Sequence, residues 1–247
     1  MELPTLPKIK GIFLTGTDTN VGKTWVAAGL TATLKEQGAQ AVYFKPIQSG
    51  CPSEEGRLVP TDARLAADVA GLTEPLEVLT PVALRLPLAP GVAAAQAGIK
   101  VDLERIAAGV RDLASRYEFF VVEGAGGLYV PLIGLDFLVL DMIRWLELPL
   151  VVVAKSGLGT INHTVLTVKA ALAANIQVTG IILNRWPQKP GLAEETNPDV
   201  IAALTKVPVL GRLPEVPDLI DPAGRGPFLS ALRPIAQRLI TKYGTKH

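Results

Sequence analysis

The chain has 247 residues, of which 49% are hydrophobic and 19% are charged. This composition supplies a large apolar core and excludes a disordered chain. The formal net charge is +1, so no excess of charge favours a nucleic acid or a membrane surface as a partner. The length fits one α/β domain over residues 1–247, and the single cysteine, Cys51, excludes an intrachain disulfide. Because the apolar stretches are too short to span a bilayer and residues 1–10 do not have the pattern of a signal peptide, we expect a cytoplasmic protein.

Short apolar runs alternate with helical patterns along the whole chain. Most runs are apolar on both faces, which is typical of a parallel sheet covered by helices on both sides. They predict strands at residues 11–15, 41–44, 119–123, 150–154, 180–184 and 207–211. The helical patterns predict helices at residues 24–37, 62–70, 101–117, 137–147, 161–175, 198–204 and 228–243, the last of them docked on the surface. Residues 187–197 predict a polar loop and residues 214–227 a segment that wraps the surface.

This alternation predicts an α/β fold with a doubly wound, mostly parallel sheet and helices on both faces. In such a sheet the ligand site lies beyond the carboxyl ends of the strands. The motifs that follow the predicted strands are therefore the candidates for chemistry.

The first predicted strand leads into Gly-Thr-Asp-Thr-Asn-Val-Gly-Lys-Thr, residues 16–24. A strand, a turn that ends in Gly-Lys-Thr and then a helix form a P-loop, whose backbone N–H groups hold phosphates at the helix N-terminus. We expect Lys23 to contact the β- and γ-phosphates and Thr24 to offer its hydroxyl to Mg²⁺. The strict pattern has a glycine five positions before Gly22, where this chain has Thr17. The alternative, a chance Gly-Lys-Thr at a helix start, is disfavoured by the strand that precedes it.

The second predicted strand ends in Lys-Pro-Ile-Gln-Ser-Gly, residues 45–50. Pro46 stops the strand, which places Lys45 and Ser49 at the carboxyl edge of the sheet beside the P-loop. A lysine there can neutralise a second anionic group. An ordinary exposed lysine in a turn explains the pattern equally well.

Acidic residues mark two further positions. Glu123 ends an apolar strand and precedes Gly-Ala-Gly-Gly, a layout typical of a second Mg²⁺ ligand in P-loop enzymes, with glycines that let a ligand approach the backbone. The alternative is a solvated glutamate in a tight turn. Asp62 opens a predicted helix, and on its own it predicts a helix cap.

Together these motifs resemble those of the dethiobiotin synthetases. The residues that carry the resemblance are 16–24, 45–50, 123–127 and 157–164, in the family's order and spacing across about residues 11–215. The resemblance implies a P-loop NTPase fold and an ATP-dependent cyclo-ligase of biotin biosynthesis. In that reaction 7,8-diaminopelargonic acid and CO₂ form a carbamate, and ATP phosphorylates the carbamate to a carbamic-phosphoric mixed anhydride. The second amine then closes the ureido ring, which gives dethiobiotin, ADP and phosphate.

The resemblance also implies a role for individual residues. The residues with a catalytic role are Lys45, Lys23 and Thr19. The residues that bind ATP are Asp18, Thr19, Asn20, Val21, Gly22, Lys23, Thr24, Asp62, Glu123, Asn184, Pro214 and Glu215. The residues that surround Mg²⁺ are Thr24, Asp62 and Glu123, so Asp62 changes from a helix cap to a metal-site residue. The residues that bind the substrate are Ser49, Gly126, Gly159, Thr160 and Asn162.

The resemblance further implies a homodimer in which each substrate site is shared across the interface. Asn20 stands where some relatives have an acidic residue. His163 lies within a motif of the family, and we interpret it as a structural or interface residue rather than a base. Cys51 follows the second motif, and we interpret it as an inert small residue.

Three other classes share parts of this pattern. Switch ATPases of the partitioning and division-site type have this fold, but their P-loop carries an extra lysine near its start, where this chain has Gly-Thr-Asp at residues 16–18. Amidating ligases of the cobyrinic acid type usually add a glutamine-hydrolysing domain with a nucleophilic cysteine, and Cys51 lies in the wrong half of the chain for one. A small-molecule kinase is the third alternative.

Overall fold

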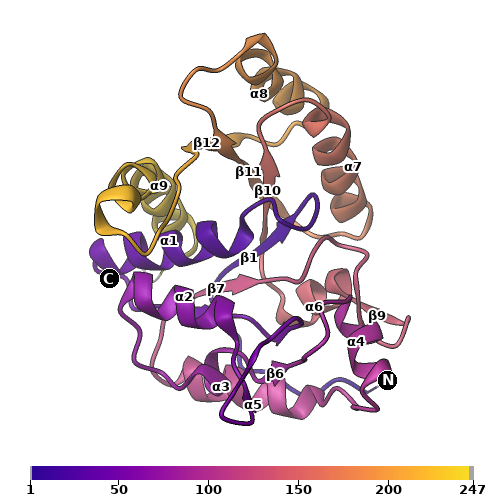
Figure 1. Ribbon diagram of the computed structural model, residues 1–247. Helices are drawn as coiled ribbons and strands as arrows, with labels where there is room; N and C mark the ends of the chain where they lie inside the picture. The colour runs from indigo at the N-terminus through magenta and orange to yellow at the C-terminus, as the bar shows by residue number, and fades with distance from the viewer. Residues whose placement is uncertain (1, 245–247) are drawn as a thin grey trace.

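Six parallel strands form the central sheet of the protein (Figure 1). The computed structural model describes residues 2–244. Across the sheet the strands are, in order, β12 (Val209–Pro214), β11 (Val178–Trp186), β10 (Leu150–Lys155), β1 (Gly11–Gly16), β7 (Phe119–Glu123) and β2 (Ala41–Phe44). Every residue of β1, β2 and β7 is buried, which explains why these strands are apolar on both faces.

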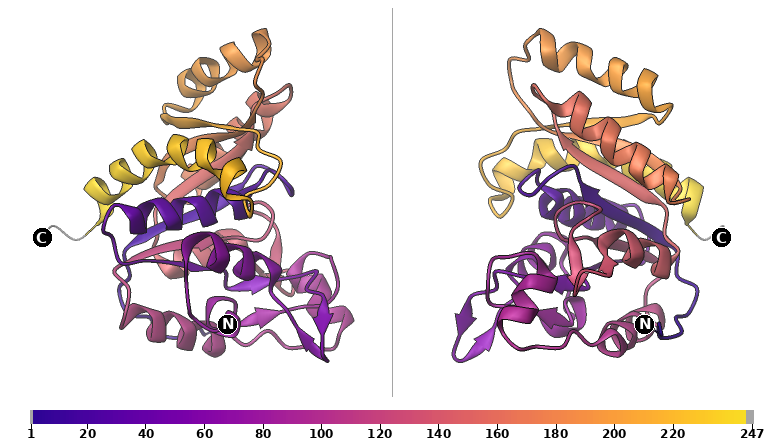
Figure 2. Two further views of the ribbon diagram at one scale, coloured as in Figure 1. Left: turned by 60° about the vertical axis from the view of Figure 1, so that its left-hand side comes forward. Right: turned by 90° about the vertical axis from the view of Figure 1, so that its right-hand side faces the viewer.

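Helices cover both faces of this sheet. They are α1 (Lys23–Glu36), α2 (Thr61–Ala70), α3 (Leu76–Leu79), α4 (Pro90–Gln96), α5 (Leu103–Ala114), α6 (Val139–Leu146), α7 (Thr160–Ala173), α8 (Leu192–Thr205) and α9 (Pro222–Tyr243). The chain enters at β1 in the middle of the sheet; α1 leads from there to the edge strand β2, whereas α6, α7 and α8 lead stepwise toward β12. Because such crossovers are right-handed, α1 lies on one face and α6–α8 lie on the other. Figures 1 and 2 show α9 beside α1 and away from α7 and α8.

This winding in two directions confirms the doubly wound sheet predicted from the sequence. The loops at the carboxyl ends of β1, β2, β7, β10 and β11 meet at one edge of the sheet, and the residues of the candidate site lie there. Helix α9 packs on α1, as predicted for a docked terminal helix. Gly29 of α1 makes room for it, since a Cβ at Gly29 would lie 2.5 Å from the side chain of Leu232. Among residues 2–244, none of the helices is both long and apolar enough to cross a membrane.

Three pairs of very short strands lie outside the central sheet. They are β3 (Ile47–Gln48) with β6 (Val82–Ala83), β4 (Ser53–Glu54) with β5 (Arg57–Leu58), and β8 (Pro131–Ile133) with β9 (Phe137–Leu138). The sequence did not predict these pairs, nor α3 and α4, because two to seven residues are too few to show a periodic pattern.

Several predicted boundaries are wrong. Helix α8 begins at Leu192, inside the predicted loop 187–197, and α9 begins at Pro222, inside the predicted surface segment 214–227. Both helix starts bury few side chains, so they carry no apolar periodicity. The strand predicted at 207–211 begins later, at Val209, and residues 137–138 of the helix predicted at 137–147 form β9.

Candidate functional site

The loop between β1 and α1 folds around the side chain of Lys23. The Lys23 ammonium donates to the carbonyl oxygen of Asp18 at 3.1 Å. A Cβ at Gly16 would lie 2.6 Å from that carbonyl and 2.9 Å from Nζ of Lys23, so this close approach requires glycine at position 16. The next residue, Thr17, donates its backbone N–H to the carbonyl of Val153 in β10 at 3.0 Å. The structure thus explains why this P-loop has glycine one position earlier than the strict pattern.

The end of the loop is fixed by Asn184 from β11. Its amide Nδ2 donates to the carbonyl of Val21 at 2.9 Å. A Cβ at Gly22 would lie 2.1 Å from that nitrogen, and Gly22 has a φ of 91°, so glycine is required there. Asn20 has a φ of 58°, in the left-handed region that asparagine tolerates better than most residues. Strand β11 therefore holds the turn that presents Lys23.

Lys23 is 7% exposed, and this burial lowers the pKa of its ammonium to about 8. Lys45 lowers the pKa further, whereas the carboxylates of Glu123 and Asp62 act in the opposite direction. A buried ammonium with a lowered pKa is short of negative partners. A phosphate group placed in the loop would supply them.

Lys45 lies between two carboxylates at the carboxyl end of β2. Its ammonium donates to Oε1 of Glu123 at 2.8 Å and to Oδ2 of Asp62. Burial opposes the charge on Lys45, but the two carboxylates outweigh it and raise the pKa of Lys45 above its ordinary value. Lys45 and Glu123 are 6% and 1% exposed, so the alternatives of an exposed turn lysine and a solvated glutamate are both wrong.

The position of Asp62 in the sequence, taken alone, predicts that it caps α2, and this prediction is wrong. The residue at the N-cap is Pro60, and Asp62 lies in the first turn, where its carboxylate contacts Lys45. Gln48, which was not predicted from the sequence, forms hydrogen bonds with the first turn of α2 instead. Its side chain accepts from the backbone N–H of Asp62 at 3.2 Å and donates to the hydroxyl of Thr61 at 3.0 Å. Freed from capping, the Asp62 carboxylate is available to the site.

Tyr43 is a second residue that the sequence analysis missed. Its hydroxyl donates to Oε2 of Glu123 at 2.7 Å, and its side chain is fully buried in β2. Burial, followed by the negative charges of Glu123 and Asp62, raises the pKa of Tyr43 well above its ordinary value, so the hydroxyl keeps its proton. The signal in the sequence was its position two residues before Lys45, on the same face of the strand.

The oxygen atoms around Lys45 fit a magnesium ion in chemical type. The hydroxyl of Thr24 donates to Oε1 of Glu123 at 2.8 Å, and Asp62 reaches the same lysine as Glu123. One hydroxyl and two carboxylates are hard oxygen ligands of the kind Mg²⁺ prefers. Within residues 2–244 there is no group of three or more His, Cys, Asp or Glu side chains placed to hold a metal on its own. Mg²⁺ usually takes one or two carboxylates and completes its shell with substrate phosphates and water, so the residues present fit the ion.

Two cavities open beside the P-loop. We call the first, of about 720 Å³, the lysine cavity, and the second, of about 650 Å³, the outer cavity. Sequence-predicted residues that line the lysine cavity are Thr19, Asn20, Gly22, Lys23, Thr24, Lys45, Ser49, Asp62, Glu123 and Gly126. Sequence-predicted residues that line the outer cavity are Gly22, Asn184, Pro214 and Glu215. The predicted residues Asp18 and Val21 support the loop through their carbonyl groups instead.

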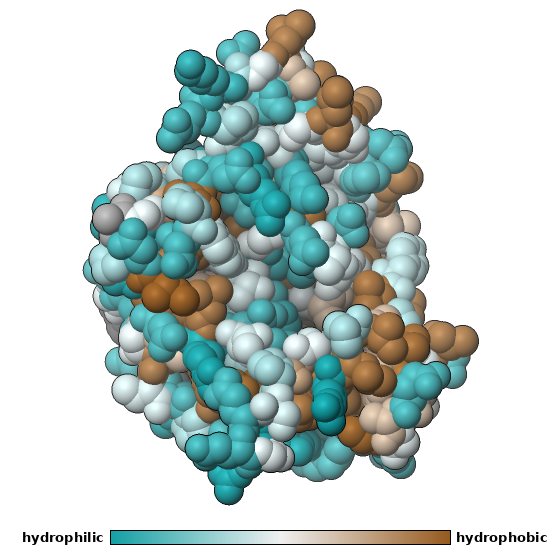
Figure 3. Space-filling view, viewed as in Figure 1, coloured by the Kyte–Doolittle hydropathy of each residue, from teal (hydrophilic) through white to brown (hydrophobic). Residues whose placement is uncertain are grey.

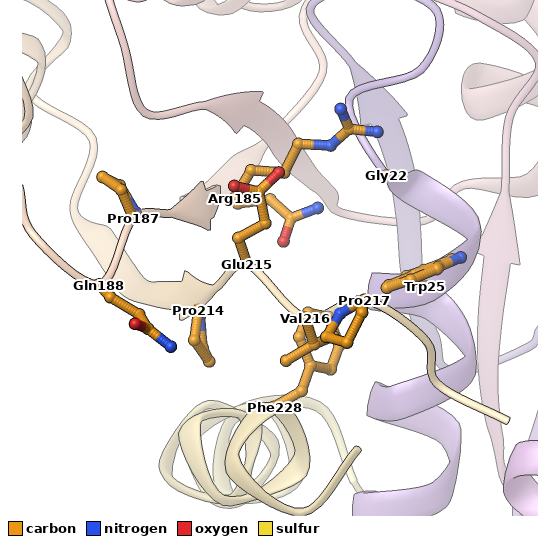
Figure 4. A pocket seen from close by; sticks show the side chains of 11 residues that line it. Gly22, Trp25, Arg185, Pro187, Gln188, Pro214, Glu215, Val216, Pro217 and Phe228 are labelled. Atoms are coloured by element: carbon orange, nitrogen blue, oxygen red, sulfur yellow. The ribbon is translucent and has the colours of Figure 1, made fainter. Parts of the chain in front are cut away.

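The outer cavity has an aromatic wall that the sequence analysis did not predict (Figure 4). Trp25 of α1 and Phe228 of α9 meet edge to face, with ring centroids 6.5 Å apart. Trp25 and Arg185 line both cavities, so they lie where the two meet. Two helices from opposite ends of the chain build this wall, which is why no local motif indicated it.

Residues 10–223 match the family of proteins described as AAA domain. An ATP-dependent dethiobiotin synthetase of Bacillus licheniformis is 44% identical over 210 residues, which covers 85% of this chain and 88% of that protein. Proteins with the same name from Thermodesulfovibrio yellowstonii and Bacillus subtilis are 40% and 41% identical; the alignments cover 85% and 84% of this chain, and 90% and 88% of theirs. The chain belongs to the dethiobiotin synthetase family.

Solved structures support the fold of this dethiobiotin synthetase family member. The MinC:MinD cell division complex of Aquifex aeolicus matches with a TM-score of 0.60 and 16% identity, over 94% of this chain and 96% of that chain. The structure of Cyanthece apo McdA matches with a TM-score of 0.58 and 10% identity, over 94% and 99%. At such identities the likeness shows the fold alone, and it confirms the predicted P-loop NTPase fold.

The predicted substrate residues Gly159, Thr160 and Asn162 are not among those that line the two cavities. Gly159 precedes α7 with a φ of 87°, and Leu158 beside it is 93% exposed. Thr160 is buried, and its hydroxyl donates to the carbonyl of Lys155 at 2.6 Å. Asn162 is exposed. Within a single chain, then, the structure does not bring this part of the family's motif to the lysine cavity.

Cys51 is buried below the second motif. Its thiol donates to the carbonyl of Gln48 at 3.4 Å, and burial raises the pKa of the thiol. A protonated buried thiol is a poor nucleophile, which agrees with the interpretation of Cys51 as an inert small residue.

Proposed function

We propose that this protein is an ATP-dependent dethiobiotin synthetase. It converts 7,8-diaminopelargonic acid and CO₂ to dethiobiotin in biotin biosynthesis, with ATP as co-substrate, and releases ADP and phosphate. The observation that carries the proposal is the pair of buried lysines, Lys23 and Lys45, that line one cavity with Glu123 and Asp62 around them. Membership of the dethiobiotin synthetase family selects this reaction among those that a P-loop site can perform.

The reaction requires two anions to approach each other. The γ-phosphate of ATP and the carbamate both carry negative charge, and two unit charges about 4 Å apart repel by about 4 kcal/mol at an effective dielectric constant of about 20. Lys23, held in the P-loop, is assigned to the phosphates, and Lys45, at the end of β2, is assigned to the carbamate. Thr19 lines the lysine cavity beside them. The protein then acts mainly by positioning the two groups and stabilising their charge.

Thr24, Asp62 and Glu123 are assigned to hold Mg²⁺. When bound, the ion neutralises charge on the phosphate oxygens. Lys45 contacts both Asp62 and Glu123 and so keeps the two carboxylates near each other.

The outer cavity is assigned to the base of ATP. Asn184 closes one side of it, and its amide can both donate and accept, as the edge of adenine requires. Pro214, the last residue of β12, and Glu215 line the same cavity. Trp25 and Phe228 add flat apolar surface suited to an aromatic ring.

The diaminopelargonic acid is assigned to the lysine cavity beside Ser49 and Gly126, and its distal carboxylate to Gly159, Thr160 and Asn162 of a partner subunit. The exposed apolar residues Leu158, Leu166, Tyr129 and Leu135 support a homodimer, because large exposed apolar groups commonly mark interaction surfaces. Some of the apolar surface is visible in brown in Figure 3. We also assign the whole chain to one catalytic domain in the cytoplasm; the single central sheet and the use of ATP support this.

The test is ADP release by the purified protein with ATP, Mg²⁺ and diaminopelargonic acid, in the presence and absence of bicarbonate. We expect strict dependence on both the diamine and the CO₂ source, with dethiobiotin as the product. Turnover without bicarbonate would indicate a small-molecule kinase, and turnover that requires glutamine would indicate an amidating ligase. ATP hydrolysis that follows dimerisation and ignores the diamine would indicate a switch ATPase.

A further inference from the structure

Tyr43 is a fully buried polar side chain that has no part in the reaction proposed above. In the sheet Tyr43 of β2 pairs with Val121 of β7, and Glu123 follows Val121 by two residues on the same strand. Paired residues of parallel strands point to one face, and side chains alternate along each strand. Tyr43 and Glu123 therefore share a face, and the length of the tyrosine ring bridges the offset between them, with its hydroxyl 2.7 Å from Oε2 of Glu123.

The two oxygens of Glu123 have different partners. Oε1 accepts from the hydroxyl of Thr24 and from the ammonium of Lys45, each at 2.8 Å, and both of these residues line the lysine cavity. Oε2 accepts from Tyr43, which is not among the residues that line that cavity. The last torsion of a glutamate side chain is broad and roughly two-fold. The tyrosine hydroxyl thus holds the oxygen that faces away from the cavity, and this contact restrains the plane of the carboxylate.

We propose that Tyr43 is a positioning residue for the reaction: its hydroxyl holds one oxygen of the Glu123 carboxylate and so fixes the orientation in which the other oxygen is offered to the magnesium ion. The inference rests on the proposed function, which gives Glu123 its place at the metal. Mg²⁺ demands near-ideal geometry from few protein ligands, so a carboxylate that turns freely is a poorer ligand than one held in place. Groups that orient metal ligands typically change metal affinity or activity by about 10- to 100-fold.

A purely structural role makes a different prediction. If Tyr43 only fills the core and finds the nearest acceptor, then loss of its hydroxyl lowers stability and leaves the magnesium requirement unchanged. Tyr117 provides the matched comparison, because its hydroxyl also donates to a buried carboxylate, that of Glu74. Neither Tyr117 nor Glu74 is among the residues that line the lysine cavity or the outer cavity.

The experiment compares Tyr43→Phe and Tyr117→Phe with the wild type. Binding of a non-hydrolysable ATP analogue is measured by calorimetry over a series of Mg²⁺ concentrations, and thermal unfolding is measured in parallel. We expect both variants to unfold at lower temperature. Only Tyr43→Phe should raise the Mg²⁺ concentration for half-maximal binding, by about tenfold, with binding of the metal-free analogue unchanged. An unchanged Mg²⁺ midpoint in folded Tyr43→Phe would overturn the inference.

Tyr43→Phe is then tested in a protein that already carries Glu123→Gln. If Tyr43 acts through Glu123, then adding Tyr43→Phe to Glu123→Gln should not move the Mg²⁺ dependence further, since the two changes remove one interaction. A further shift overturns the inference, and this comparison also serves if Tyr43→Phe alone is too unstable to purify. Analogue binding by the wild type that ignores Mg²⁺ would overturn the metal assignment together with the inference. If the wild type depends on Mg²⁺ and Tyr43→Phe has the same Mg²⁺ midpoint as the wild type, the inference is overturned and the metal assignment stands.

Discussion

Lys23 and Lys45 both lie buried at the carboxyl end of the sheet, yet their charges are held in different ways. Lys45 has two carboxylates in direct contact, which raise its pKa. Lys23 contacts a backbone carbonyl, and burial lowers its pKa to about 8. Protein carboxylates therefore balance the charge of Lys45, whereas no carboxylate is in hydrogen-bond contact with Lys23 among the contacts of residues 2–244.

Replacement of Lys23 by alanine should abolish turnover and leave the fold intact. The ammonium meets charge that grows on the transferred phosphoryl group, and removal of one such stabilising group typically costs about 10²–10³ in kcat. Steady-state ADP release with diaminopelargonic acid and bicarbonate measures the effect. Lys35→Ala is the control, because Lys35 lies on the same helix and its ammonium donates to the carbonyl of Gly71 at an exposed site. Activity of Lys23→Ala within about tenfold of the wild type would refute the P-loop assignment.

The lowered pKa of Lys23 predicts that nucleotide binding is coupled to proton uptake. Well below pH 8 the lysine is protonated in both free and bound protein, so little proton uptake accompanies binding. Phosphate oxygens favour the charged form and raise the pKa in the complex. As pH rises above about 8, the free lysine loses its proton and binding must restore it, so affinity falls with pH.

Calorimetry in buffers with different ionisation enthalpies measures this proton uptake. Lys23→Arg is the control, since a guanidinium stays protonated throughout this range and should bind without uptake. Equal heats in all buffers for the wild type at about pH 9 would contradict the assignment of Lys23 to the phosphates.

The sequence indicated many of the residues that line the lysine cavity but did not indicate the contacts around them. For Lys45 the sequence left a buried and an exposed interpretation open, because the residues that bury it are distant: Asp62 and Glu123 lie 17 and 78 positions further along the chain. Tyr43 and Trp25 appear as ordinary core residues in the sequence. Their functional contacts exist only after the sheet register and the α1–α9 packing have formed.

Among the elements, α2 and α5 are joined by a small polar cluster remote from the site. Glu74, after α2, accepts from the hydroxyl of Tyr117 and from Arg116 at 3.0 Å, and both of these residues follow α5. Burial alone would raise the pKa of Glu74, but these hydrogen bonds and the arginine charge outweigh it and lower the pKa. The cluster links the segment that follows α2 to the segment that follows α5.

Replacement of Glu74 by glutamine should lower stability near neutral pH by about 1–3 kcal/mol, because it removes charge-assisted hydrogen bonds at a buried site. A carboxyl group with a lowered pKa stabilises the fold above its unfolded pKa of about 4.3, and that stability is lost as pH falls through the folded value. The wild type and Glu74→Gln should therefore converge in acid. Urea unfolding at neutral and acidic pH measures this.

The control for this change is Glu104→Gln. Glu104 pairs with Arg111 on the exposed face of α5, where an ion pair contributes little. The variant should unfold like the wild type at neutral pH. A similar loss of unfolding free energy in both variants would show that the Glu74 cluster contributes no more to stability than a surface ion pair.

Strands and helices were predicted well where their burial produces a clear pattern of apolar residues in the sequence, and poorly where it does not. The strands β2 and β7 match their predicted bounds, because every residue in them is buried. Helix α8 was recognised only in its second half, where Ile201 and Thr205 are buried, because its first residues face outward. The helix cap that the position of Asp62 predicts on its own is wrong for a related reason: Gln48, from a different segment, accepts from the backbone N–H of Asp62.

For the whole molecule, the position of the motif around Gly159 bears on the proposed homodimer. Gly159 begins α7, whose first N–H groups and positive dipole end suit a carboxylate. It is not among the residues that line the lysine cavity, and Leu158 beside it projects into solvent. A homodimer that places this helix start against the partner's lysine cavity would account for both facts, because it completes the site and covers the leucine.

This arrangement predicts that two inactive variants complement each other. Gly159→Val should raise the KM for diaminopelargonic acid and spare ATP binding, because a side chain at a φ of 87° distorts the helix start. Lys23→Ala has an intact helix start and an inactive P-loop. In a mixed dimer one composite site is then whole, so random exchange of equal amounts should restore about a quarter of wild-type activity.

The control for the glycine change is Gly38→Val. Gly38 has a φ of 86°, and no atom lies within 4 Å of a Cβ built there; at Gly159 the nearest atom is Cε1 of His163 at 4.0 Å. Gly38 lies at the far end of α1. This variant carries the same backbone strain and should keep the wild-type KM for the diamine. Subunit exchange is followed with two differently tagged chains. If exchange is complete and the mixture of Lys23→Ala and Gly159→Val stays inactive, each chain must build its substrate site alone, and the shared site is refuted.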